Sequence, residues 1–258
     1  MTPVQAIIAK ELRSYFVSPV VYVAIAVFLL SFGFLAYTLV DRTSTLALQQ
    51  MQMGTGAAAQ LNLNDLVFRP LTAWTGFLLF LVVVPLLTMR LLAEERKLRT
   101  FELLMTSPAR LNEIVVAKFL SVYIIMLGLI GSTCIVPLTL TLFNDFEWNP
   151  VLVNYLGLAL QAGLFIAVGL FASALTENQI ISALISFGLL FLLWLLGVAG
   201  MTFGDTTSGN ILAYLAFGEH FGHFVSGLVD TKDLVYYASG IALMLFLAHR
   251  VLESTRWK

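Results

Sequence analysis

The sequence predicts an all-α polytopic membrane protein that crosses the bilayer six times as a single domain. Of its 258 residues, 59% are hydrophobic and only 11% are charged, whereas soluble domains contain roughly 25% charged residues. The apolar residues fall in runs about as long as the helix that crosses a bilayer, roughly 20 residues. These runs do not alternate between apolar and polar residues as barrel strands would, so helices are expected.

The first element, residues 1–19, is predicted to be an amphipathic helix. Its apolar residues recur at spacings of three and four, while Lys10 and Arg13 fall between them. The apolar positions are Val4, Ile7, Ile8, Leu12, Tyr15 and Phe16. This pattern indicates a helix that lies flat at the membrane interface.

Six apolar runs follow, at about 20–40, 71–89, 115–143, 151–175, 180–201 and 234–249. Three pairs of a capping residue with proline are typical of helix starts: Ser18-Pro19, Ser107-Pro108 and Asn149-Pro150. Thr176 with Gln179 predicts a capping box that opens the fifth span after a short turn. Pro85 and Pro137 lie inside spans and predict kinks.

Positive charge predicts the orientation. One side of the spans holds eleven of the fourteen lysines and arginines: Lys10, Arg13, Arg90, Arg96, Lys97, Arg99, Arg110, Lys118, Arg250, Arg256 and Lys258. The other side has only Arg42, Arg69 and Lys232. By the positive-inside rule, both termini, the loop 90–113 and the turn near 176 are cytoplasmic. We therefore expect a multi-pass protein of a bacterial cytoplasmic membrane.

Residues 202–233, between the fifth and sixth spans, are too polar to cross the membrane. They contain an apolar patch, 211–217, and so form either a short re-entrant element or a cap on the outer side. His220 and His223 form an H-x-x-H pair beside Glu219. That spacing is poor for two metal ligands on one helix face, and no cysteine is near, so a packing role is the preferred interpretation.

Missing residue types limit the function. The predicted span interiors contain no Asp, Glu, Lys or Arg, Lys118 standing only at the start of the third span. Proton-driven carriers need such groups, so that class is disfavoured, and a sodium-coupled carrier or channel is weakened. The chain also lacks G-x-x-x-x-G-K-[ST] and any hydrolytic motif. We expect no enzymatic activity, cofactor or nucleic-acid partner, and ATP would have to bind another polypeptide.

The segment 90–108 is the densest charge cluster. Glu95 and Arg99 stand four residues apart in the favourable order, and Glu94 with Lys97 and Arg99 with Glu102 stand three apart. These pairs predict a stiff helix, with an apolar face formed by Leu91, Leu98, Phe101, Leu104 and Met105. A solvated loop on the membrane is the simpler alternative. A rigid helix joined to two spans would nevertheless be a suitable lever.

Several segments resemble a known family. They are KELRSYFVSPVVYV (10–23), TMRLLAEERKLRTFELLMTSP (88–108), EIVVAKFL (113–120), SALTENQIISALISFGLLFLLWLL (173–196), HFVSGLVDTKDLVYY (223–237) and LESTRWK (252–258). Through them the chain is similar to permease subunits of type-2 ABC exporters, and more narrowly to the gliding-motility-associated permease GldF.

The resemblance implies a six-span half-transporter that dimerises and binds two ATP-binding subunits on its cytoplasmic face. Residues 1–19 would be the interface helix and the region from Glu94 to Met105 the coupling helix. The turn from Thr176 through Glu177 to Gln179 would make a smaller second contact. The resemblance also implies a possible GldG-like partner with a large domain outside the cytoplasmic membrane.

These expectations lead to a permease subunit that couples ATP hydrolysis to substrate export. The residues expected to couple are Glu94, Glu95, Arg96, Arg99, Phe101 and Glu102. Thr75, Phe77, Ser182 and Phe187 are weak candidates for the translocation path, and an ordinary packing role is the preferred interpretation for them. The alternative is an ATP-driven mechanical or signalling assembly that acts on an extracytoplasmic partner without transport. The cargo does not follow from the sequence.

Overall fold

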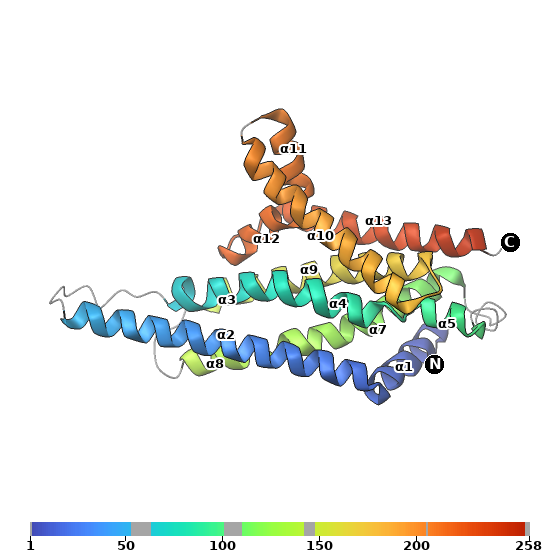
Figure 1. Ribbon diagram of the computed structural model, residues 1–258, viewed down its shortest axis with the longest axis horizontal. Coiled ribbons are helices and arrows are strands. Elements are labelled where there is room, and N and C mark those ends of the chain that lie inside the picture. Colours follow the sequence, from blue (N-terminus) through green and yellow to red (C-terminus); the bar gives the residue numbers. More distant parts are fainter. Residues whose placement is uncertain (1, 53–62, 101–109, 142–147, 205, 256–258) are drawn as a thin grey trace.

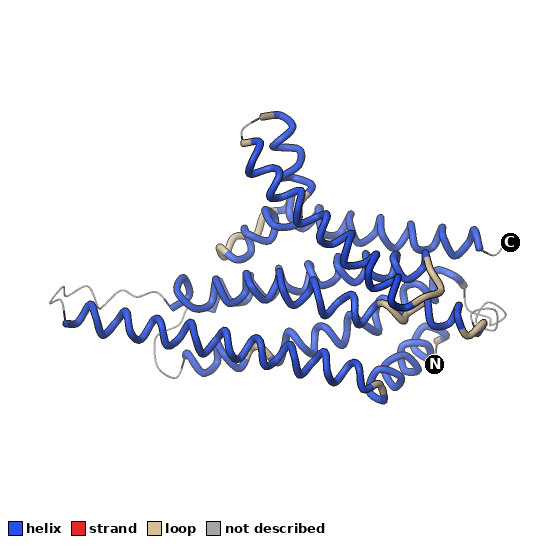
Figure 2. Tube along the Cα trace, in the orientation of Figure 1, coloured by secondary structure: helices blue, strands red, loops and turns tan. Residues whose placement is uncertain are grey.

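The computed structural model describes residues 2–52, 63–100, 110–141, 148–204 and 206–255. Throughout these residues the secondary structure is helical and no strand occurs (Figure 2). The elements are α1 (Pro3–Val17), α2 (Pro19–Gln52), the π-helix η2 (Asn64–Phe68), α3 (Arg69–Trp74), the π-helix η3 (Thr75–Leu79), α4 (Phe80–Thr88), α5 (Ala93–Lys97), α7 (Leu111–Ser132), α8 (Ile135–Thr141), α9 (Trp148–Leu175), α10 (Gln179–Phe203), α11 (Thr207–Leu215), α12 (Phe217–Val225) and α13 (Thr231–Thr255).

Six stretches of helix are long and apolar enough to cross a membrane, which confirms the all-α polytopic prediction. They are Pro19–Gln49, Asn64–Lys97, Leu111–Thr141, Trp148–Leu175, Gln179–Phe203 and Thr231–Ser254. The first two differ most from the predicted runs. α2 continues past residue 40 through Asp41 and Arg42, and the second stretch begins at Asn64. Helical hydrogen bonding continues through these polar residues, so hydropathy alone misplaced both ends.

The helix α9 forms the centre of the bundle. It packs against α4, α7, α10, α12 and α13, and most of its length is buried. Gly169 permits the closest of these approaches, because a Cβ at that position would overlap the side chain of Thr88 on α4. α2, α10 and α13 lie at the outside, with most of their surface exposed within one copy of the chain.

Both ends of the described chain lie at one end of the bundle. α1, α5 and the C-terminal end of α13 come together there (Figure 1). At the other side, the second half of α10 projects from the bundle and α11 returns alongside it (Figure 1). Gly200 permits this pairing, because a Cβ there would lie 2.8 Å from the backbone nitrogen of Ala213. Residues 206–230 therefore form two short helices, and whether they enter a bilayer stays a prediction.

The predicted helix starts have mixed outcomes. Ser18-Pro19 does separate α1 from α2, whereas α9 begins at Trp148, just before Asn149-Pro150. Residues 107–108 lie outside the described residues. The predicted Thr176 cap is wrong: Asn178 caps α10 by accepting a hydrogen bond from the Ile180 amide at 2.9 Å. Asn178 is closer to the first free amides of the helix and satisfies them directly.

Proline breaks the third span, as predicted, but not at the proline itself. The helix stops at Ser132 and resumes at Ile135, and Pro137 lies within α8. The proline ring clashes with the carbonyl four residues earlier, at Thr133, which is where the helix is interrupted. Pro85 leaves α4 continuous, and the π-helix η3 precedes it directly.

Candidate functional site

The short helix α5 is held in place by the end of α9. After α4 ends, the chain turns so that the backbone amides of Leu92 and Ala93 both donate to the hydroxyl of Ser173, at 3.0 and 3.1 Å. That hydroxyl in turn donates to the carbonyl of Met89 at 3.2 Å. Ser173 is fully buried, and so are Leu92 and Ala93. One side chain of α9 therefore fixes the start of α5.

A buried cluster of charges lies directly under α5. The ammonium group of Lys118, on α7, lies 2.8 Å from the carboxylate of Glu11 on α1 and 2.9 Å from that of Glu95 on α5. It also donates to the carbonyl of Leu91 at 2.6 Å. Lys10 reaches the other oxygen of Glu95 at 3.1 Å. We call Lys10, Glu11, Glu95 and Lys118 the ion network.

Three of the four side chains in the ion network are buried, and only Lys10 is exposed. The Lys118 side chain is 1% exposed, and those of Glu11 and Glu95 are 11% and 12% exposed. An ammonium group at such a depth is costly unless carboxylates and hydrogen bonds surround it. Here Lys118 donates hydrogen bonds to Glu11 and to the carbonyl of Leu91, and its ammonium group also forms an ion pair with Glu95. The network therefore ties α1, α5 and α7 together.

Around the ion network, α1 is further attached to the end of α4. The hydroxyl of Tyr15 donates to the carbonyl of Leu87 at 2.7 Å, and the guanidinium of Arg90 lies 4.0 Å from the centre of the Tyr15 ring. Burial raises the pKa of Tyr15, so it stays a neutral donor. For Lys10, burial lowers the pKa but the Glu95 carboxylate outweighs that effect, and the net pKa is raised.

The turn between α9 and α10 contacts α5 through Arg96. The guanidinium of Arg96 donates to the carbonyl of Ala174 and lies 3.8 Å from the carboxylate of Glu177. The Thr176 hydroxyl accepts a hydrogen bond from the Asn178 amide within the turn. The structure thus brings Glu95, Arg96 and Glu177, all expected coupling residues, into one region.

The predicted helix over this segment is wrong in its extent. α5 ends at Lys97, and Arg99 has a left-handed backbone with φ 55°. Consequently the expected Glu95–Arg99 pair is absent: among the described residues, the ion pairs of Glu95 are with Lys10 and Lys118. Buried tertiary pairing outweighs a local helical pair that contributes only about 0.5 kcal/mol.

Two further parts of the coupling prediction have different outcomes. Leu91 is buried as expected from the apolar face, whereas Leu98 is exposed. Phe101 and Glu102 lie outside the described residues, as do Leu104 and Met105. Glu94 is half-buried and Arg99 is exposed, and neither forms an ion pair with another described residue. Glu94, Leu98 and Arg99 are therefore the free surface of this segment.

The candidates for a translocation path lie in different environments. Thr75 is buried in η3 and donates to the carbonyl of Leu71 at 2.6 Å. Ser182 is buried on the inner side of α10. Phe77 packs against Trp194, with ring centres 5.1 Å apart. Phe187 alone of the four is exposed, on the outer face of α10.

The histidine pair of the outer loop converges on one carboxylate. Nδ1 of His220 lies 2.6 Å from Asp233, and Nδ1 of His223 lies 2.9 Å from the other oxygen of the same side chain. Nε2 of His220 lies 2.9 Å from the carbonyl of Tyr214, which can only accept, so Nε2 carries a proton. Both nitrogens of His220 thus lie within hydrogen-bond distance of an oxygen.

Among the described residues, no group of three or more His, Cys, Asp or Glu side chains is arranged to hold a metal ion. The carboxylate of Asp233 is fully buried and forms the anchor that joins α12 to α13. The proximity of Asp233 was not anticipated from the sequence, because it stands ten residues beyond His223.

The main residues missed by sequence reasoning are Glu11, Lys118 and Ser173. Glu11 stands between Ile7 and Tyr15 on the buried stripe of α1, where an acidic residue breaks the apolar pattern. Lys118 stands seven residues into an otherwise apolar helix. Glu11 and Lys118 are charged residues on buried faces, and that signal would have indicated a partner.

Residues 5–251 match the family model described as ABC-2 family transporter protein. The chain belongs to this family. As an ABC-2 transporter protein it is a membrane-spanning permease component of an ABC transporter, a class that is generally non-catalytic and works with a separate ATP-binding subunit. Among curated proteins, none matches the chain.

Proposed function

We propose that this ABC-2 transporter protein is the permease subunit of an ATP-driven exporter, and that α5 couples ATP hydrolysis on a partner to substrate movement across the cytoplasmic membrane. The observation that carries the proposal is the attachment of α5 on three sides. It is bonded to α1 and α7 through Glu95, and to α9 through Ser173 and Arg96. A displacement of α5 must therefore be shared by all three helices.

The expected coupling residues divide into two roles. Glu95, Arg96 and Glu177 make the internal contacts that transmit force, as described above. Glu94 is half-buried and Arg99 is exposed, and neither has an ion-pair partner in the described chain, so they contact the ATP-binding subunit in our proposal. We propose that Phe101 and Glu102 extend this contact, and that Thr176 supports the turn beside it.

The end of the bundle that contains α5 also supports the proposed orientation and assembly. α1, α5 and the end of α13 lie at the same end, and their lysines and arginines support our proposal that this end faces the cytoplasm of a bacterial cell. Two copies of the chain with two ATP-binding subunits form the proposed unit. The exposed apolar face of α10, with Leu184, Phe187 and Phe191, supports a contact between the copies. A GldF-like role with a GldG-like partner remains part of the proposal.

Co-purification of an ATP-binding subunit tests the docking part. We expect the double variant Glu94→Lys and Arg99→Glu to lose the partner, since both changes reverse charge on the exposed surface. Lys232→Glu is the matched control. It reverses the charge of an exposed residue at the start of α13, at the far end of the bundle from α5, and should retain the ATP-binding subunit. Retention of the partner by the double variant would contradict the proposed contact.

Coupling is tested separately with Glu95→Gln. This variant keeps the exposed surface but removes the carboxylate from Lys118, so we expect the partner to bind normally and its ATPase activity to lose stimulation by the permease. Liposomes that contain the assembled complex then report ATP-dependent movement of solutes. Stimulated hydrolysis without movement of any solute would contradict export and would favour the mechanical alternative.

A further inference from the structure

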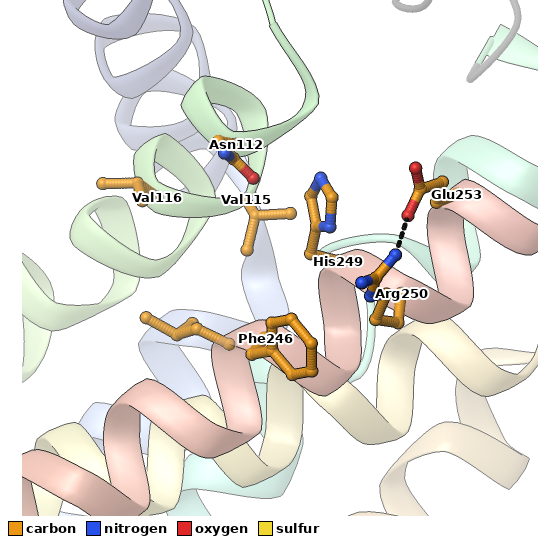
Figure 3. A pocket seen from close by; sticks show the side chains of 8 residues that line it. Asn112, Val115, Val116, Phe246, His249, Arg250 and Glu253 are labelled. Atoms are coloured by element: carbon orange, nitrogen blue, oxygen red, sulfur yellow. Dashed lines mark hydrogen bonds and ion pairs between the residues drawn. The ribbon is translucent and has the colours of Figure 1, made fainter.

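A cleft between α7 and α13 lies at the same end of the bundle as the ion network but on a different side. It has a volume of about 460 Å³, within the usual range for ligand sites of about 300–1,000 Å³. Its lining comes from Asn112, Val115 and Val116 of α7 and from residues of α13. Figure 3 shows Asn112 and Val115 pointing toward His249 of α13.

The lining is polar at one end and apolar at the other. On α13, Phe246 stands one helical turn before Arg250, and on α7, Asn112 stands one turn before Val115 and Val116. The two helices cross the bundle in opposite directions, so both polar residues lie toward the same end. Leu245 completes the apolar half, in which Phe246 and Val116 are exposed. The cleft is therefore amphipathic along the direction in which the helices cross the membrane.

Its polar half has unused hydrogen-bonding capacity. Among the described residues, the side chains of Asn112 and His249 have no hydrogen-bond partner. Arg250 donates one hydrogen bond, from Nη1 to Glu253 at 2.8 Å, and lies 5.1 Å from the ring of Phe246. Arginine has five N–H donors and a carboxylate has two oxygens, so both charges can bind a further group.

We propose that this cleft binds one aminophospholipid, with its phosphate against Arg250, His249 and Asn112 and its ammonium group against Glu253. One acyl chain lies along Val116, Leu245 and Phe246. The charges determine which class of lipid binds, because a guanidinium and a carboxylate side by side match the two charges of a zwitterionic head group. An anionic lipid would gain the first contact but would meet repulsion from Glu253.

The proposal requires only that α7 and α13 cross the bilayer, and is independent of the coupling to an ATP-binding subunit. α13 is the least buried of the spans, and a lipid in this cleft would fill the surface between it and α7. The bound lipid thus acts as a structural part of the assembly at the proposed cytoplasmic leaflet.

Native mass spectrometry of the purified chain tests the inference. From membranes or nanodiscs with equal phosphatidylethanolamine and phosphatidylglycerol, we expect one phosphatidylethanolamine to remain bound in preference to phosphatidylglycerol. The double variant His249→Ala and Arg250→Ala should lose about tenfold in retention, a modest change in affinity. Val116→Trp should do so as well, because its ring occupies the apolar half. Lys232→Ala, an exposed cation at the other end of α13, is the control and should bind as the wild type does.

Glu253→Gln tests the head-group choice within the same cleft. It keeps the size of the side chain and removes the negative charge, so the preference for phosphatidylethanolamine over phosphatidylglycerol should disappear while lipid still binds. Preference of the wild type for phosphatidylglycerol would overturn the proposal. Unchanged retention in both the His249/Arg250 and the Val116→Trp variants would overturn it equally.

Discussion

Glu95 and Lys118 form a buried ion pair between α5 and the third membrane-spanning helix, with their charged atoms 2.9 Å apart. Each group has further partners, since Lys118 also contacts Glu11 and Glu95 also contacts Lys10. The pair therefore belongs to a connected set of charges and acts as a junction of three helices. Because the pair is buried, loss of one partner should destabilise the fold more than loss of one partner of an exposed ion pair would.

Replacement of Lys118 by methionine should strongly destabilise the chain. The methionine fills similar space but removes the ion-pair partner of Glu11 and leaves Glu95 paired only with the exposed Lys10, at an expected cost of about 3–5 kcal/mol in the free energy of unfolding. Denaturant unfolding in detergent micelles measures it. Lys97→Met changes an exposed lysine of α5 and should have little effect. Equal stability of the two variants would contradict the role of the ion network.

Lys10 should react slowly with acetylating reagents. Its raised pKa keeps more of the amine protonated, and the protonated form is unreactive. Peptide mass spectrometry after labelling at about pH 9, below the ordinary lysine pKa of about 10.4, reports the rate. The variant Glu95→Gln removes the main raising influence and should label faster. Identical rates in the two proteins would show that the pairing does not persist in solution.

The raised pKa of Lys10 also determines in which direction the stability of the fold changes with pH. A lysine whose pKa is higher in the folded than in the unfolded state stabilises the fold fully below the unfolded pKa, and that contribution is lost as pH rises through the folded value. Contact between α1 and α5 through Lys10 should therefore hold across neutral pH and weaken only in strongly alkaline solution. Hydrogen exchange of residues 3–17 at increasing pH, corrected for intrinsic rates, would follow it.

Ser173→Ala should weaken the attachment of α5 to α9. The change leaves the buried amides of Leu92 and Ala93 without an acceptor, at a cost of about 1–3 kcal/mol. We expect the ATP-binding subunit still to co-purify but its ATPase activity to respond less to the permease. Ser132→Ala is the matched control, because among the described residues that hydroxyl bonds to the carbonyl of Leu129 in its own helix and to no other group. A normal ATPase response in Ser173→Ala would argue against force transmission through this contact.

Asp233→Asn should loosen the outer helices. It removes the charge that both His220 and His223 contact, and the loss of a charged hydrogen-bond partner costs about 1.5–3 kcal/mol. Hydrogen exchange in residues 217–225 should accelerate, since α12 is joined to α13 by these contacts. Asp230→Asn alters an exposed carboxylate three residues earlier and should leave α12 unchanged. Equal protection of α12 in both variants would contradict the anchoring role.

The class of fold could be predicted from the sequence. Long charge-free runs can be satisfied only by spanning helices, so six spans followed from composition alone. The ion network did not follow, because Glu11 and Lys118 are 107 residues apart and the pattern around each one does not say which residue is its partner. The extent of α5 was missed for a related reason: local pairing favoured a longer helix, while Glu95 is turned toward Lys118.

The helix α2 is long enough to extend out of the membrane. A helix of 34 residues is about 51 Å long, whereas the hydrocarbon layer is about 30 Å thick. Even with the ordinary tilt of about 20°, about 18 Å of the helix, or roughly three turns, must lie beyond the hydrocarbon layer. The stretch from Asp41 to Gln52 is then a rigid rod on the periplasmic side in the proposed orientation, carrying exposed Leu48 and Met51. A large soluble partner approaching from that side would reach this rod before it reached the membrane.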